Sequence, residues 1–180
     1  MTSSTGSTRP TEPTPTPICA HPALEIEIPP NEPVMAYRRF VKAPPKLVFE
    51  AFTDPKHLRN WWGPARLALV VCEVDLRVGG GYRFVSRAPD GQEFAFRGEY
   101  RVVDPPHKLE QTFVFEPVPD HYAVETAVFE EVEGGTIVHG RAVHDTVMAR
   151  DMHLANGMEA GMIESMERLD DVVAAAQAAA

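Results

Sequence analysis

Alternating apolar and polar residues dominate the chain from Val34 to about residue 145, and this period of two predicts β-strands. The runs are short, and Pro, Gly and Asp residues typical of turns separate them, which favours antiparallel neighbours over helical crossovers. Strands are expected at 34–42, 67–76, 82–87, 93–104, 108–116, 123–133 and 136–145. The pattern therefore predicts an antiparallel meander.

Helical spacing appears between the first two strands and again after the last strand. Val48, Phe49 and Phe52 form the apolar stripe of a first short helix. Asp54 suits an N-cap and Pro55 the first helical position, which predicts a second helix over 56–62. From about residue 146 to 176 a helix with a break near 156–157 is expected, and its apolar stripe comprises Met158, Met162, Met166, Leu169 and Val173.

A curved sheet with one apolar face and an amphipathic helix can bury these surfaces against each other. The expected fold class is therefore α+β, with one domain over residues 34–176 and a frayed C-terminus at 177–180. Residues 1–33 are rich in Thr, Ser and Pro, which predicts a disordered tail. Within that tail, Leu24 to Ile28 alternate and offer a short edge strand as the alternative.

Composition narrows the class of protein. The 180 residues carry a net charge of -9, which disfavours nucleic acid as a partner. The longest apolar run, 67–72, is far shorter than the roughly 18 residues of a spanning helix, and the N-terminus does not have the pattern of a signal peptide. Two cysteines cannot build a disulfide framework, and the Cys and His spacing does not resemble a zinc site. We expect a soluble cytoplasmic protein without a metal or cofactor. The sequence leaves open whether it binds a protein partner or forms a homodimer.

Strand alternation predicts which side chains face the C-terminal helix. Small residues such as Gly98 and Ala142 leave space there, and methionines fill irregular space adaptably. A cavity is expected, with a fully packed core as the alternative. Trp61 is expected to act as its lid, Trp62 to serve in packing or on a partner surface, and His153 to lie on the surface. The predicted ligand-binding residues are Trp61, Phe84, Phe96, Tyr100, Gln111, Phe113, Val138, Gly140, His144, Met158, Met162 and Met166.

A polar pair follows from the last hairpin. If Gly134-Gly135 is a two-residue turn, Glu125 and His144 become direct cross-strand neighbours on the inner face. A carboxylate beside an imidazole favours the charged imidazole and can serve as a general acid and base. With Tyr100 as a hydrogen-bond donor, these three residues are the candidate catalytic groups. The alternative is a solvated ion pair at the open end of the sheet.

Several motifs, taken in order, resemble one family. They are residues 46–55 (KLVFEAFTDP), Trp61-Trp62-Gly63-Pro64, Asp75-Leu76-Arg77 before Gly79-Gly80, Phe129-Glu130-Glu131 before Gly134-Gly135-Thr136, and Gly157-Met158-Glu159 with Gly161. Together they resemble the START-like (SRPBCC) superfamily, in the branch named after the activator of the ninety-kilodalton heat-shock protein ATPase. The resemblance implies a helix-grip fold with a deep pocket. One departure is Met162, which stands where the family often has an aromatic residue.

Three functions are compatible with this resemblance, since one fold hosts many activities. The first is binding of a small hydrophobic or aromatic molecule, as a carrier or in sequestration or resistance. The second is a cofactor-independent cyclase, dehydratase or isomerase that uses Glu125, His144 and Tyr100. The third is a protein-interaction module similar to the co-chaperone.

Overall fold

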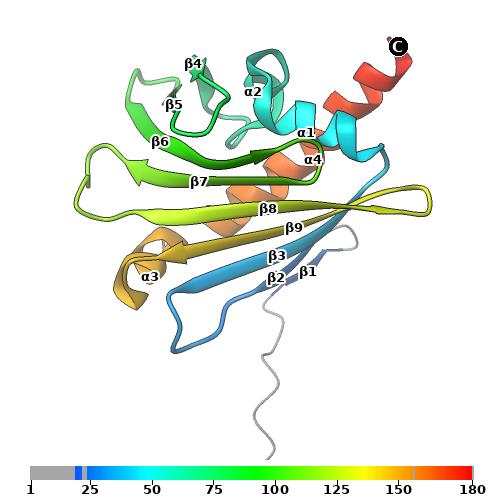
Figure 1. Cartoon of the computed structure of the whole chain (residues 1–180). Helices are drawn as coiled ribbons and strands as arrows, with labels where there is room; N and C mark the ends of the chain where they lie inside the picture. The colour runs from blue at the N-terminus through cyan, green and yellow to red at the C-terminus, as the bar shows by residue number, and fades with distance from the viewer. Residues whose placement is uncertain (1–18, 22–23, 156, 180) are drawn as a thin grey trace, which may run out of the picture.

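The computed structural model of the chain describes residues 19–21, 24–155 and 157–179. They form a nine-stranded antiparallel sheet in the order β1-β2-β3-β9-β8-β7-β6-β5-β4, with a long helix packed across one face (Figure 1). The α+β helix-grip prediction is confirmed. The strands are β1 Cys19–His21, β2 Leu24–Glu27, β3 Val34–Val41, β4 Ala68–Val74, β5 Gly81–Arg87, β6 Glu93–Asp104, β7 Lys108–Phe115, β8 Ala123–Val132 and β9 Gly135–His144. The helices are α1 Pro45–Thr53, α2 Pro55–Trp61, α3 Val147–Ala155 and α4 Met158–Ala178.

Local sequence signals account for the helices. The Asp54 carboxylate accepts a 2.8 Å hydrogen bond from the backbone N–H of Lys56, so it caps α2 as predicted, and Pro55 occupies the first turn. The break near Gly157 separates α3 from α4, and Gly157 has a left-handed φ of 78°. No helix in the described part of the chain is both long and apolar enough to cross a membrane.

The N-terminal boundary of the domain differs from the prediction. Residues 24–27 form β2, which pairs with β3 through Leu24 opposite Arg39 and Ile26 opposite Tyr37. Leu24 and Ile26 are each 2% exposed, so their alternation buries an apolar face in the core. Residues 24–27 are therefore a strand, as in the alternative, and not a disordered tail. Because β1 pairs with the other side of β2, β2 is an inner strand and not the edge of the sheet. Within the rest of the expected tail, residues 19–21 form β1 and residues 28–33 are also described, whereas 1–18 and 22–23 lie outside the described residues.

Aromatic rings fill one end of the space between the sheet and the helices. Phe129 on β8 meets the rings of Phe49 and Phe52 edge-on, at centroid distances of 5.5 and 5.2 Å. Leu169 and Val173 from α4 are buried in the same core. Helix α1 packs against both β8 and α4 here.

The β8–β9 hairpin has a different register from the one predicted. Val132 pairs with Gly135, so the turn consists of Glu133 and Gly134, and Gly134 has a left-handed φ of 83°. Gly135 instead lies in the strand, where a Cβ would be 2.3 Å from the carbonyl oxygen of Val41. Pairing is shifted by two residues along the strand, which preserves the inward and outward faces but changes every cross-strand partner.

Candidate functional site

A cavity of about 750 Å³ lies between the inner face of the sheet and helices α3 and α4. Its volume is in the range of pockets that hold small organic molecules. The predicted residues that border it are Trp61, Phe84, Phe96, Tyr100, Gln111, Phe113, His144, Met158, Met162 and Met166, and Glu125 borders it too. Strand parity brings these side chains together, because each sheet residue of the set belongs to the inner face.

Aromatic side chains form the wall on the β5–β7 side. The Trp62 ring meets Phe84 and Phe96 edge-on, at centroid distances of 4.9 and 5.3 Å, and Phe96 stacks on Phe113 at 5.3 Å. Trp61 is not a lid. It is 5% exposed and its indole N–H donates a 2.8 Å hydrogen bond to the Ala51 carbonyl, so it is anchored in the core while Trp62 lies over the sheet.

A polar row crosses this apolar surface on three neighbouring strands. Tyr100 pairs with Gln111, and Gln111 pairs with Glu125. The Gln111 Nε2 atom donates to Oε2 of Glu125 at 3.1 Å and lies 3.4 Å from the Tyr82 hydroxyl, which donates to the Thr112 carbonyl at 2.8 Å. Burial raises the pKa of Glu125 above its ordinary value, and the Gln111 hydrogen bond opposes this only in part.

Glu125 and His144 are not cross-strand partners, which corrects the prediction. In the observed register Glu125 is opposite Ala142, and His144 is opposite Ala123, so the two residues are diagonal neighbours on the inner face. The prediction failed because it placed the turn one residue too far along, which shifts each cross-strand partner by two residues. The expected charged imidazole is also wrong, since burial lowers the pKa of His144 despite the opposing effect of Asp145.

His153 belongs to the cavity rather than to the surface. Its ring stacks on Phe113 at a centroid distance of 5.8 Å and meets the His144 ring at 5.4 Å. Burial and the neighbouring His144 lower the pKa of His153 to about 4. The two imidazoles are therefore neutral at neutral pH, and each offers one donor and one acceptor nitrogen.

Val138 and Gly140 do not border the cavity. Val138 is fully buried in the core. Gly140 is covered by Tyr37 of the neighbouring strand, whose Cε1 atom would be 1.9 Å from a Cβ at this position. Tyr37 therefore borders the cavity in place of Gly140.

Tyr37, Trp62 and His153 are among the lining residues that were missed from the sequence. Tyr37 shares its face with Met35 and the buried Arg39, so alternation along the first strand carried the signal. His153 lies one turn after the buried Ala149 on α3, which is the inward spacing of an amphipathic helix. Among the described residues, no cluster of His, Cys, Asp and Glu has an arrangement that could hold a metal ion.

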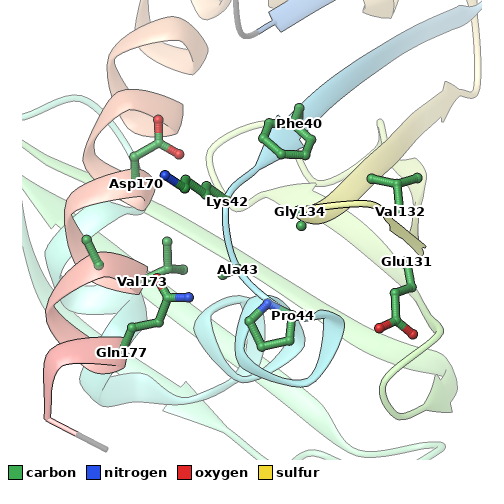
Figure 2. A pocket seen from close by; sticks show the side chains of 12 residues that line it. Phe40, Lys42, Ala43, Pro44, Glu131, Val132, Gly134, Asp170, Val173 and Gln177 are labelled. Atoms are coloured by element: carbon green, nitrogen blue, oxygen red, sulfur yellow. The ribbon is translucent and has the colours of Figure 1, made fainter.

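A second hollow of about 830 Å³ lies at the other end of the molecule, between the end of β3, the β8–β9 hairpin and the last turns of α4. Figure 2 shows the Lys42 side chain pointing toward Asp170 at one side of this hollow, and Glu131 at the opposite side. Phe40 is the one aromatic side chain among its lining residues, and it is 44% exposed. Aromatic walls and buried polar groups together are features of the first cavity, which is accordingly the candidate site.

Solved structures share this arrangement. A protein from Rhodobacter sphaeroides is 28% identical with a TM-score of 0.77, over 84% of this chain and 99% of that chain. A protein from Nitrosomonas europaea is 25% identical with a TM-score of 0.73, over 81% and 96%. For a protein from Aeromonas hydrophila described as AHSA1-like the identity is 23% and the TM-score 0.63, over 80% and 94%, which shows the fold alone.

The sequence gives no match among curated proteins. It does match one family, described as Activator of Hsp90 ATPase homolog 1-like protein, over residues 42–174. The matched region extends from the end of β3 to the last turns of α4, and so contains most of the sheet and nearly all of the cavity wall. Because this match spans well over half of the sequence, the chain belongs to the Activator of Hsp90 ATPase homolog 1-like family.

Proposed function

We propose that the protein binds a small hydrophobic or aromatic molecule in the cavity between the sheet and α4. The observation that carries this proposal is the composition of the cavity wall. Aromatic rings from β5, β6 and β7 face methionines from α4, and a few polar groups converge on the same space. This is the usual composition of small-molecule sites, in which apolar walls supply affinity and isolated polar groups fix orientation.

The free-energy cost of an empty apolar cavity supports the proposal that the cavity is filled. Even about 300 Å³ of dry apolar space costs on the order of 7 kcal/mol at the coefficient measured for core truncations. That cost is comparable with the whole stability of a typical domain. We therefore expect water or a ligand to fill the space, and the flexible Met158 and Met162 to adapt to the occupant.

Native mass spectrometry of freshly purified protein tests this proposal directly. We expect a co-purifying small molecule, or, from a screen of apolar and aromatic compounds, binders that raise the melting temperature. Ala127 borders the cavity, whereas the adjacent Val128 is 39% exposed on the opposite face of β8. Ala127→Phe should abolish binding and the matched control Val128→Phe should retain it. Absence of any binder, or equal binding by the two variants, would contradict the proposal.

The other two functions remain predictions. Catalysis by Glu125, His144 and Tyr100 was inferred from a Glu125–His144 pair that the observed register does not form. Docking of a protein partner concerns the outer surface. A binder should tolerate His144→Ala with altered affinity only, whereas an enzyme should lose turnover.

A further inference from the structure

The directions of the hydrogen bonds at the polar end of the cavity show whether a ligand meets a donor or an acceptor there. The Tyr82 hydroxyl donates away from the cavity, to the Thr112 carbonyl, and the Gln111 amide donates to Oε2 of Glu125. The amide N–H of Gln111 is therefore already directed at the carboxylate. Glu125 keeps part of its surface uncovered, and that surface borders the cavity. A ligand consequently meets an acceptor at this point.

The charge of Glu125 is uncompensated by the chain as far as it is described. None of the ion pairs among the described residues includes Glu125, and its hydrogen bond comes from a neutral amide. An ionised carboxylate in an apolar site is stabilised strongly only by an opposite charge or by several hydrogen bonds. A cationic group that enters the cavity would supply both.

The surrounding rings favour the same kind of ligand. Trp62, Phe84 and Phe96 form a connected aromatic cluster on one wall, and such rings pack favourably against the aromatic part of a ligand. His144 and His153 are neutral and do not repel a cation, because burial lowers the pKa of each. A ligand carboxylate, in contrast, would be repelled by Glu125, and the two arginines among the lining residues, Arg66 and Arg141, are exposed.

We infer that the ligand of this cavity is an aromatic or hydrophobic molecule with a protonated nitrogen, such as an arylalkyl amine, whose N–H groups pair with the Glu125 carboxylate. This inference rests on the proposed function and specifies its ligand class. The aromatic part lies against Trp62, Phe84 and Phe96, and the amine reaches the row formed by Gln111 and Glu125.

Three probes that share a naphthalene ring with one attached carbon test the charge requirement. They are 2-naphthylmethylamine, 2-naphthylmethanol and 2-naphthoic acid, each titrated into the full-length protein by calorimetry at neutral pH. We expect the amine to bind about tenfold or more tightly than the alcohol, which is the range of a charge-assisted hydrogen bond, and the acid to bind most weakly.

Glu125→Gln removes the charge and preserves the shape of the side chain. This variant should bind the amine and the alcohol with similar affinity. Glu130→Gln is the matched control, since Glu130 lies exposed on the same strand and pairs with His139 on the outside. The control should retain the full preference for the amine.

The pH dependence of the wild-type protein provides a test that needs no variant. Besides Gln111, the groups near Glu125 are Tyr37 of β3 and Tyr82 of β5, whose pKa values are raised, and the diagonal His144. Lowering the pH through the pKa of Glu125 should weaken binding of the amine and leave binding of the alcohol nearly unchanged. Protonation of the two imidazoles, His144 and His153, at low pH would also repel the amine. This repulsion would persist in Glu125→Gln, which separates it from the effect of Glu125.

The outcomes separate the two proposals. Equal affinity for amine and alcohol in the wild type, or an undiminished amine preference in Glu125→Gln, would overturn the amine inference and leave the binding proposal intact. Failure of all three probes, together with failure of the broad compound screen, would overturn both. If Glu125→Gln does not fold, the wild-type selectivity and its pH dependence decide the inference.

Discussion

Replacement of Gly140 by alanine tests the packing that shapes one wall of the cavity. Gly140 lies directly opposite Tyr37 on β3, and the Tyr37 ring covers the position of the missing side chain. A Cβ would be 1.9 Å from Cε1 and 2.1 Å from Cζ of this ring. The ring has to move by about 1.5 Å before these contacts become ordinary van der Waals distances.

The expected loss of stability in Gly140→Ala follows from the lack of space for the new Cβ. Overpacking of a core position costs about 1–3 kcal/mol, and part of the cost is offset because alanine reduces the freedom of the unfolded chain by about 0.4–1 kcal/mol. For a domain of this size each kcal/mol shifts the melting temperature by about 2–4 °C. We expect Gly140→Ala to lower the melting temperature by several degrees and to move Tyr37 into the cavity, which weakens ligand binding.

Differential scanning calorimetry and titration with a cavity ligand measure the two effects. Gly81→Ala is the control, because a Cβ at Gly81 meets its nearest atom at an ordinary 3.5 Å and the residue is exposed. The variant Tyr37→Leu/Gly140→Ala should recover much of the lost stability, since leucine lacks the overlapping ring atoms. Wild-type stability and wild-type affinity in Gly140→Ala would refute the assignment of Tyr37 to this wall.

Two further predictions concern pH and the N-terminal strand. The pKa of folded His153 is about 4, below the ordinary 6.5, so the folded state favours the neutral ring. The contribution of this group to the free energy of unfolding, at most about 3 kcal/mol, is complete above pH 6.5 and is lost as the pH falls toward 4. His153→Phe should remove this loss, which denaturant unfolding across the same pH range measures. Leu24→Ala should lower the free energy of unfolding by about 2–5 kcal/mol, because Leu24 is buried in the core, whereas the exposed Glu25→Ala should change it by about 0.5 kcal/mol or less. Equal effects of Leu24→Ala and Glu25→Ala would mean that β2 contributes little to folding.

Local signals in the sequence were enough to define most elements. Asp54 and Pro55 start α2 through a side-chain cap and a fixed φ, and both features depend only on neighbouring residues. Alternation along the later strands assigned their inner faces, including Phe96, Gln111 and Glu125, because the direction of a side chain in a strand depends only on parity. The family resemblance then supplied the way in which sheet and helix combine.

These local signals did not predict the register of strand pairing. Gly134 and Gly135 are adjacent, but one adopts a left-handed φ in the turn and the other avoids the Val41 carbonyl of a strand far away in the sequence. Sequence alone treats them as one turn, which shifts the register by two residues and creates a Glu125–His144 pair that does not exist. Only the packing of β3 against β9 distinguishes the two roles.

The chain's own pattern thus determined the elements, their faces and the chemical character of the inner surface, since these follow from periodicity and local capping. Tertiary structure decided which polar groups meet. It paired Glu125 with Gln111, brought His153 from α3 against His144, and placed Tyr37 over Gly140. Such contacts join segments far apart in the sequence, and they depend on register and helix placement, which local preferences do not encode.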